Sequence, residues 1–164
     1  MKQPHKKVIK KSAKQKKIVK NKKAWKHPKF GTSKLEEDFA RDFLDKIGVE
    51  YIYQFEAKDI GRFYDFYLPK SNLIIEVDGS YYHSDPRLVD EGKMNPMQKR
   101  NKRVDEYKDK WALSHGKPIM RIWEKDIREN PKSVMKALKE RLYIENEKIE
   151  LTEKKNKRHV NKIK

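Results

Sequence analysis

The apolar positions along this chain change from helical to strand-like spacing and back again. Apolar residues three or four apart mark one face of a helix, whereas alternation at every second position marks a strand. Residues 33–47 have helical spacing, with Ser33 as the N-cap, Gly48 just past the end, and an apolar face formed by Leu35, Phe39, Phe43, Leu44 and Ile47. Residues 49–55, 62–68 and 73–77 then follow the pattern of three strands.

The second half of the chain returns to helical spacing. Residues 97–113 predict a helix whose apolar side chains are available to the core, namely Met97, Val104, Tyr107, Trp111 and Leu113. A fourth strand is expected over 118–123, followed by a last helix from Asn130-Pro131 to about Tyr143. Helix, three strands, helix, strand and helix in this order predict an α/β fold, a mixed sheet flanked by helices.

Two segments of the chain lack the apolar residues that a core requires. The polar segment 84–96 is expected to be a mobile loop in which Asp85 and Asp90 are solvated charges. Residues 146–164 are dominated by charged side chains and are expected to fray from the end of the last helix.

The positive charge of the chain is concentrated at its two ends. The formal net charge is +17, yet residues 1–29 hold 13 lysines and no acid, and residues 152–164 hold 6 basic residues and 1 acid. The part between them, 30–151, has 23 basic and 24 acidic residues. We therefore expect a basic disordered arm over 1–30, a folded domain over 31–145 and a charged C-terminal tail over 146–164. Nucleic acid is the polyanion that such arms favour, and a membrane surface competes with it.

Other features of the composition limit the compartment in which the protein acts and the kind of metal site that it can have. No apolar run approaches the ~20 residues of a membrane-spanning helix, and the lysine-rich start lacks the apolar segment of a secretory signal. We expect a soluble, cytoplasmic protein that does not enter membranes. Since the chain has no cysteine, any metal site must use oxygen and imidazole ligands.

Two carboxylates stand in the most apolar strand of the chain. Residues two apart on a strand share a face, so Glu76 and Asp78 project from one side of the strand, and Leu73, Ile75 and Val77 from the other. Like charges in a buried position repel each other and lose hydration unless a cation lies between them. A divalent metal is the simplest such cation.

Asp65 is a third acid in an apolar setting. By itself it could pair with Arg62 or Lys58, because aspartate is costly to bury. The short connection from 69 to 72 instead allows an antiparallel hairpin that would bring Asp65 next to Glu76 or Asp78. Asp65, Glu76 and Asp78 would then form a site for Mg²⁺, for which carboxylate oxygens are suitable ligands.

Two further residues have both a structural and a chemical interpretation. Glu36 lies three residues after Ser33, so it can be a capping-box partner or an additional acidic group. His83 can be a loop histidine with a structural hydrogen bond, or a proton donor or acceptor beside the carboxylates. The neighbouring acids favour the second role for His83, and the other four histidines lack such neighbours.

Several of these segments, in this order, resemble the PD-(D/E)XK nuclease superfamily, and within it the very-short-patch repair endonucleases and the EDxHD phage homing endonucleases. The segments are Asp65-Phe-Tyr-Leu-Pro, Ile75-Glu-Val-Asp-Gly-Ser-Tyr-Tyr-His83, the helix with Gln98, Asn101, Arg103 and Asp105, and Arg121-Ile-Trp-Glu-Lys-Asp-Ile127. The resemblance covers roughly residues 32–143. Asp78 takes the place of the lysine in the superfamily name.

The resemblance implies a restriction-endonuclease-like αβββαβ core and a metal-dependent DNA endonuclease. It implies catalytic roles for Glu36, Asp65, Asp78, His83 and Asp105. One or two Mg²⁺ ions, which Mn²⁺ can replace, would be the cofactor, without a small organic one, and homing, repair and restriction are all compatible roles.

Contacts to double-stranded DNA are expected from two regions. One is the helix 97–113, through Gln98, Arg100 and Arg103, for which simple surface charge is an equal alternative. The other is the basic arm, through Lys10, Lys11, Lys16, Lys17, Lys22 and Lys23. Two alternative hypotheses are a non-catalytic nucleic-acid-binding protein that uses its lysine-rich tails, and an RNA-associated protein of ribosomal type.

Overall fold

A computed structural model of the chain describes residues 33–163, with side chains described to residue 156. The predicted basic arm and its six lysines therefore lie outside the described residues. The elements in chain order are α1 (Lys34–Phe39), η2 (Ala40–Leu44), α2 (Asp45–Ile47), β1 (Ile52–Ala57), β2 (Arg62–Leu68), η3 (Pro69–Ser71), β3 (Leu73–Asp78), η4 (Glu91–Lys93), α3 (Pro96–Ser114), β4 (Ile119–Trp123), α4 (Glu124–Glu129) and α5 (Pro131–Ile163).

The four strands form one mixed sheet in the order β1-β2-β3-β4. Strand β2 pairs antiparallel with both β1 and β3, whereas β3 pairs parallel with β4. The parallel pair requires a crossover between its strands, and helix α3 makes it. The predicted α/β fold with a mixed sheet flanked by helices is confirmed.

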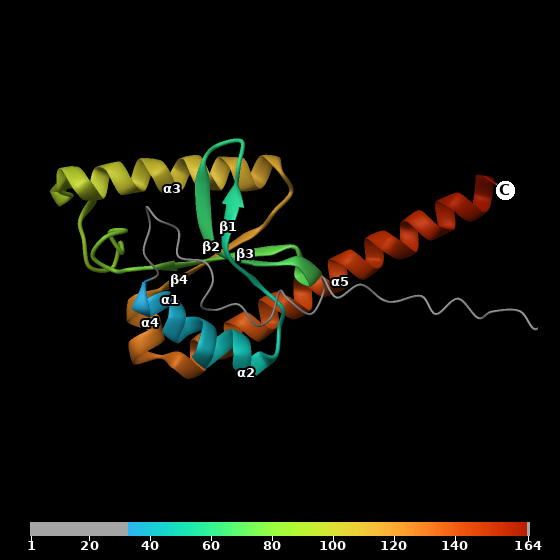
Figure 1. The fold of residues 1–164 in the computed structure, drawn as a ribbon, viewed down its shortest axis with the longest axis horizontal. Coiled ribbons are helices and arrows are strands. Elements are labelled where there is room, and N and C mark those ends of the chain that lie inside the picture. The colour runs from blue at the N-terminus through green and yellow to red at the C-terminus, as the bar shows by residue number, and fades with distance from the viewer. Residues whose placement is uncertain (1–32, 164) are drawn as a thin grey trace, which may run out of the picture. The chain divides into compact units, whose positions relative to one another are not determined.

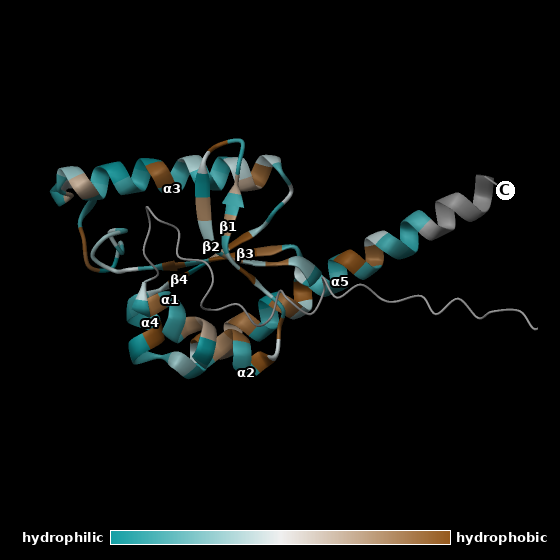
Figure 2. Ribbon diagram, viewed as in Figure 1, coloured by the Kyte–Doolittle hydropathy of each residue, from teal (hydrophilic) through white to brown (hydrophobic). Residues whose placement is uncertain are grey.

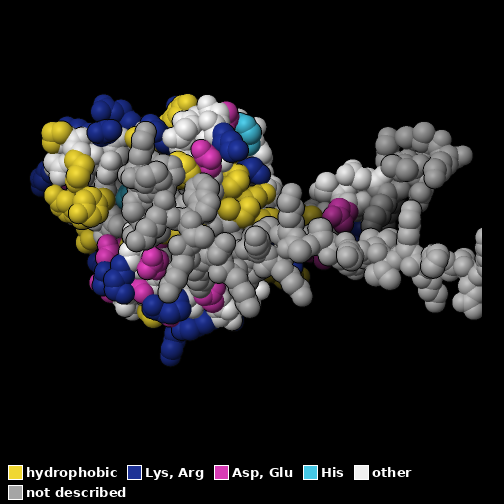
Figure 3. Space-filling model, viewed as in Figure 1, with side chains coloured by type: hydrophobic (Ala, Val, Ile, Leu, Met, Phe, Trp, Pro, Cys, Tyr) yellow, Lys and Arg dark blue, Asp and Glu magenta, His cyan; other side chains and the backbone are white. Residues whose placement is uncertain are grey.

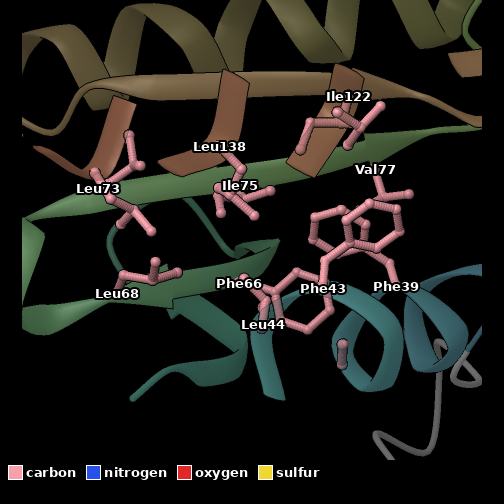
Figure 4. Packing of buried hydrophobic residues seen from close by; sticks show 13 residues of the cluster. Phe39, Phe43, Leu44, Phe66, Leu68, Leu73, Ile75, Val77, Ile122 and Leu138 are labelled. Carbon is pink, nitrogen blue, oxygen red and sulfur yellow. The ribbon is translucent and has the colours of Figure 1, made fainter. Parts of the chain in front are cut away.

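Helices cover both faces of the sheet (Figure 1). The larger core lies between the sheet and the layer formed by α1, η2, α2, α4 and α5, and it includes Phe39, Leu44, Phe66, Ile75 and Leu138 (Figure 4). A smaller cluster of Ala57, Tyr64, Ile74 and Ala112 lies on the other face, against α3. Strand β3 contributes to both, and all six of its residues are buried. Covering on both faces explains why its sequence is almost continuously apolar.

The first helix begins as its sequence predicts. Ser33 has an extended backbone and its hydroxyl accepts a hydrogen bond from the Glu36 N–H, so Ser33 is the N-cap. The helical segment ends at Gly48, whose φ of 79° is a left-handed conformation that glycine adopts without a steric penalty. Between them, η2 is π-helical and carries buried Phe43 and Leu44 into the core.

Strands β1 and β2 both exchange faces at Gln54 and Asp65, where the pairing between the two strands is interrupted. Tyr53 and Phe66 are register partners in the larger core, whereas Phe55 and Tyr64, the next pair in the register, pack in the α3 cluster. Residues two apart in a regular strand would share a face. Gln54 has a φ of 53°, and the β2–β3 pairing stops at Phe66. The sheet is thus interrupted where Asp65 lies.

Helix α3 differs from its prediction in the side chains that it buries. Met97, Tyr107 and Leu113 are 39%, 49% and 82% exposed, and the buried residues are Gln98, Lys108 and Ala112. Figure 2 shows α3 as largely hydrophilic along its length. The inward face of α3 meets polar groups of the loop after β3 and of β3 itself, so buried polar side chains are the ones that find partners there.

The segments expected to be irregular are more ordered than predicted. Asp85 is fully buried and not a solvated charge, because the Arg87 guanidinium binds both its oxygens and also reaches Asp126 of α4. Asp90 is exposed, as predicted. Helix α5 continues through the predicted tail to Ile163, where fraying from residue 146 was expected. Polar and charged sequence does not prevent a helix that a buried first half has already nucleated.

Candidate active site

The two acids of β3 are buried in the middle of the sheet. Glu76 and Asp78 are each 2% exposed. In the parallel pairing with β4, Glu76 is opposite Arg121 and Asp78 is opposite Trp123. The structure confirms that the strand buries both acids, so that each requires a polar partner.

Asp65 joins them through the interruption of the sheet. Its Oδ2 accepts a hydrogen bond from the Val77 N–H at 2.7 Å, so a carboxylate takes a place that a backbone carbonyl takes in a regular ladder. Val77 lies between Glu76 and Asp78, and Asp65 therefore faces the peptide that links the two β3 acids. The predicted hairpin therefore places Asp65 beside the part of β3 that carries Glu76 and Asp78.

A cation that nothing in the local sequence distinguishes completes this group. Lys108 of α3 donates from Nζ to Glu76 Oε2 at 2.6 Å, and its side chain is only 10% exposed. The Tyr64 hydroxyl donates to the Lys108 carbonyl, and the ammonium lies 4.8 Å from the centre of the Tyr64 ring. A lysine among many charged residues of a helix has no distinguishing local signal, and only its position opposite Glu76 identifies it.

Glu36 approaches the same group from α1. Its Oε2 accepts hydrogen bonds from the Tyr53 hydroxyl at 2.9 Å and from the Gln54 amide at 2.8 Å. Burial raises the pKa of the Glu36 carboxyl above its usual value. Its side chain is thus bound to β1 at the interruption of the sheet, which favours the interpretation of Glu36 as a member of the acidic group.

The electrostatics of the group follow from its burial. Burial, with repulsion from Glu36, raises the pKa of Asp65 to about 7. Burial, with repulsion from Asp65, raises the pKa of Glu76 to about 8, although Lys108 opposes this shift. Lys108 lowers the pKa of both Asp65 and Glu76 but does not offset the effect of their burial, so additional positive charge would stabilise the group. We call Glu36, Asp65, Glu76 and Lys108 the Glu76 network.

A second set of charged residues lies at the end of β3. His83 Nδ1 is 2.8 Å from Asp105 Oδ2 of α3 and 3.7 Å from Asp78 Oδ1. Burial alone would lower the pKa of His83, but the hydrogen bond to Asp105 and the charge of Asp78 outweigh it, so the pKa is raised. His83 and Asp105, predicted from separate segments, are therefore direct partners.

Arg121 of β4 connects this second set. Its Nη1 lies 3.0 Å and 2.9 Å from the two oxygens of Asp78, and its Nη2 donates to Asp109 at 2.7 Å. Nη1 is also 3.8 Å from Asp105 Oδ1. We call Asp78, His83, Asp105, Asp109 and Arg121 the Asp78 network.

The Asp78 network opens into a pocket of about 500 Å³ between α3 and the segment 84–94. Besides the five residues of the network, Trp123, Lys102 and Glu106 are among the residues that line the pocket. The Arg87 contacts to Asp85 and Asp126 fasten the segment that forms its outer wall. Reactive groups that border a pocket can reach a substrate. The residues of the Glu76 network are not among those that line this pocket.

The fit of a metal ion can be judged from the oxygen atoms that remain available. Glu76 Oε1 is buried and has no hydrogen-bond partner among the described residues. Asp65 and Glu76 therefore fit a hard divalent cation by chemistry and by their need for positive charge. Asp78 fits less directly, because Arg121 already binds both of its oxygens. Within residues 33–163, no three histidine or acidic side chains are gathered as a ready-made metal centre.

The residues predicted to contact DNA from helix 97–113 differ in their surroundings. Gln98 is buried, accepting from the Asn95 N–H and donating to the Tyr81 carbonyl, so it holds the loop and does not present a free side chain. Arg100 and Arg103 are exposed. On the face shown in Figure 3, basic and acidic side chains of the described part are interspersed. The six lysines of the arm lie outside the described residues.

No helix within residues 33–163 has the length and apolar character needed to cross a membrane. Comparison of the chain with protein-family models, with curated proteins and with solved structures finds no match.

Proposed function

We propose that this chain is a metal-dependent endonuclease that hydrolyses phosphodiester bonds of double-stranded DNA. The observation that carries the proposal is the pair Asp65 and Glu76 at the interruption of the sheet, where a buried Glu76 oxygen lacks a partner. Burying a carboxylate oxygen without a partner costs free energy. Proteins retain such groups where a bound cation serves a function.

The neighbouring residues supply the other groups that phosphodiester hydrolysis requires. A Mg²⁺ ion held by Asp65 and Glu76 would lower the pKa of a bound water and stabilise charge on the phosphoryl oxygens. Lys108 offsets the charge of Glu76 and fixes its carboxylate. The sequence resemblance to PD-(D/E)XK nucleases supports the same assignment of Asp65.

His83 is the group suited to proton transfer. Asp105 holds its ring by the 2.8 Å contact at Nδ1, and the raised pKa favours the protonated imidazole near neutral pH. His83 also lines the pocket, so its ring is open to a substrate. Its role would be to protonate the leaving oxygen of the cleaved strand.

Binding to DNA would combine the folded domain with the lysine-rich arm. The 13 lysines of residues 1–29 would neutralise phosphates and release counterions, which makes binding strongly salt-dependent and independent of sequence. Exposed Arg100 and Arg103 are additional candidates on α3. The arm would thus supply affinity, and the two networks the chemistry.

The decisive experiment is cleavage of supercoiled plasmid by the full chain in the presence of Mg²⁺, Mn²⁺ or a chelator. Cleavage is expected with either ion and not with the chelator. Glu76→Gln and Asp65→Asn are each expected to reduce the rate at least ~100-fold, as the loss of several kcal/mol of transition-state stabilisation implies. The matched control is Glu140→Gln, an acid of α5 whose side chain is 62% exposed, which is expected to leave the rate unchanged. Equal cleavage by all variants would refute the proposal.

The alternative function is nucleic-acid binding without catalysis, which the lysine-rich arm by itself favours. It predicts that the full chain binds duplex DNA or structured RNA but never cleaves it. Removal of residues 1–29 would then abolish binding, whereas Asp65→Asn would have no effect. Comparing the salt dependence of binding to duplex DNA and to structured RNA distinguishes the two nucleic acids.

A further inference from the structure

Arg121 occupies the position that a cation bound to Asp78 would need. Asp78 is 2% exposed, and the Arg121 Nη1 contacts both of its oxygens. A guanidinium that faces both oxygens of a buried carboxylate fills the space beside them and repels the charge of a metal ion there. If Asp78 is to bind metal, Arg121 must first leave it.

Arg121 can leave because it is not enclosed. Its side chain is 22% exposed, and Arg121 and Asp78 both line the pocket of about 500 Å³, although Asp78 is only 2% exposed. Its second nitrogen is bound to Asp109, whose side chain is 51% exposed. Asp78 is therefore held in place, whereas the Arg121 guanidinium borders a space into which its side chain can rotate.

We propose that Arg121 competes with the divalent cation for Asp78. In the resting protein its guanidinium neutralises Asp78, and metal binds through Asp65 and Glu76 alone. When a phosphate enters the pocket, the guanidinium exchanges the carboxylate for the phosphate, with which it can form paired hydrogen bonds. Asp78 is then available as a further ligand. This inference rests on the proposed nuclease function and adds a reason why metal and substrate would bind more tightly together than separately.

Lys102 provides a control for the general effect of positive charge. It lines the same pocket but pairs with Glu91 and does not contact Asp78. Removing either cation makes the pocket more negative, yet only removal of Arg121 frees the oxygens of Asp78. A difference between the two variants therefore measures competition at Asp78 and not the overall charge of the pocket.

The test is direct measurement of Mn²⁺ binding to the full chain, without DNA, from the electron paramagnetic resonance signal of free Mn²⁺. Arg121→Gln is expected to bind Mn²⁺ about tenfold more tightly than the unmodified protein, the factor for releasing one ion-pair contact of ordinary strength. Lys102→Gln is expected to change the affinity less than about twofold. Adding Asp78→Asn to Arg121→Gln is expected to remove the gain. An affinity of Arg121→Gln equal to or weaker than that of the unmodified protein overturns the inference.

Arg121→Lys covers the case in which Arg121→Gln does not fold, as judged by circular dichroism. Lysine keeps the charge, but its single ammonium cannot hold both Asp78 and Asp109, so a smaller gain of about threefold is expected. No gain in Arg121→Lys then overturns the inference. If the unmodified protein cleaves plasmid but neither variant gains affinity, only the competition is refuted. If no variant binds Mn²⁺ and none cleaves DNA, the proposed function is refuted together with it.

Discussion

Lys108 Nζ lies 2.6 Å from Glu76 Oε2, and the two side chains are only 10% and 3% exposed. This contact joins α3 to the central strand of the sheet through a buried ion pair. A buried pair contributes little net stability as a whole, but removing one partner leaves the other charged and unpaired. Removing Lys108 and removing the charge of Glu76 should therefore change the stability of the fold by different amounts, which can be measured.

We predict that Lys108→Met destabilises the fold more at high pH than at low pH. At about pH 9, the unpaired Glu76 carboxylate should cost about 3 kcal/mol of unfolding free energy. At about pH 5, Glu76 takes up a proton and the cost should become smaller. Urea denaturation at both pH values measures the difference, with Lys136→Met, an exposed lysine paired with Glu140, as the control. A loss independent of pH would show that the ion pair is not its cause.

The stability of the unmodified protein should fall as the pH rises toward 8. The folded-state pKa of Glu76 is about 8 and the unfolded value is 4.5, so the folded protein holds a proton that the unfolded chain releases in this interval. The stabilisation is complete below pH 4.5 and is lost progressively up to about pH 8, with a slope of up to about 1.4 kcal/mol per pH unit from this group. Glu76→Gln should flatten the profile of unfolding free energy against pH. A profile unchanged in that variant would contradict the assignment.

Loss of the Asp105 carboxylate should lower the pKa of His83. The hydrogen bond to Asp105 favours the imidazolium, and Asp105→Asn removes the charge while it keeps the shape of the side chain. Titration of the His83 ring protons by NMR gives the shift, and the high-pH limb of the cleavage profile should move in the same direction. Asp59→Asn is the control, because Asp59 contacts Trp111 and His115 instead. An unchanged His83 titration would mean that the 2.8 Å contact is absent in solution.

Arg87→Gln should release the segment that walls the pocket. Asp85 is fully buried and would lose the guanidinium that binds both its oxygens, so the segment should be destabilised. Hydrogen exchange of the Leu88 and Val89 amides, which donate to the Asp85 carbonyl, should accelerate before the sheet is affected. Arg128→Gln removes a largely exposed pair with Glu124 and should cost no more than about 0.5 kcal/mol. Equal exchange rates in both variants would contradict a role for Arg87 in fastening this segment.

Local pattern was sufficient for much of the fold. Ser33 and Gly48 set the ends of the first helical segment, and the alternation in β3 assigned Ile75 and Ile74 to opposite cores. These features depend on residues close in sequence, where periodicity and capping act. Helix α3 was the exception, since Met97, Tyr107 and Leu113 are exposed and Lys108 is buried. A charged residue opposite a buried acid has no local signature.

By itself the sequence determined that Glu76 and Asp78 lie on one face of a buried strand and that Asp65 belongs on the neighbouring strand. Only the tertiary structure decided which cation each acid meets. Lys108 and Glu76 are 32 residues apart, and Arg121 and Asp78 are 43 apart, so the pairing depends on how α3 and β4 pack against β3. Charges far apart in sequence interact only when the fold brings them together. Burial in a medium of low polarity strengthens that interaction, so these two ion pairs determine the charge around each acid.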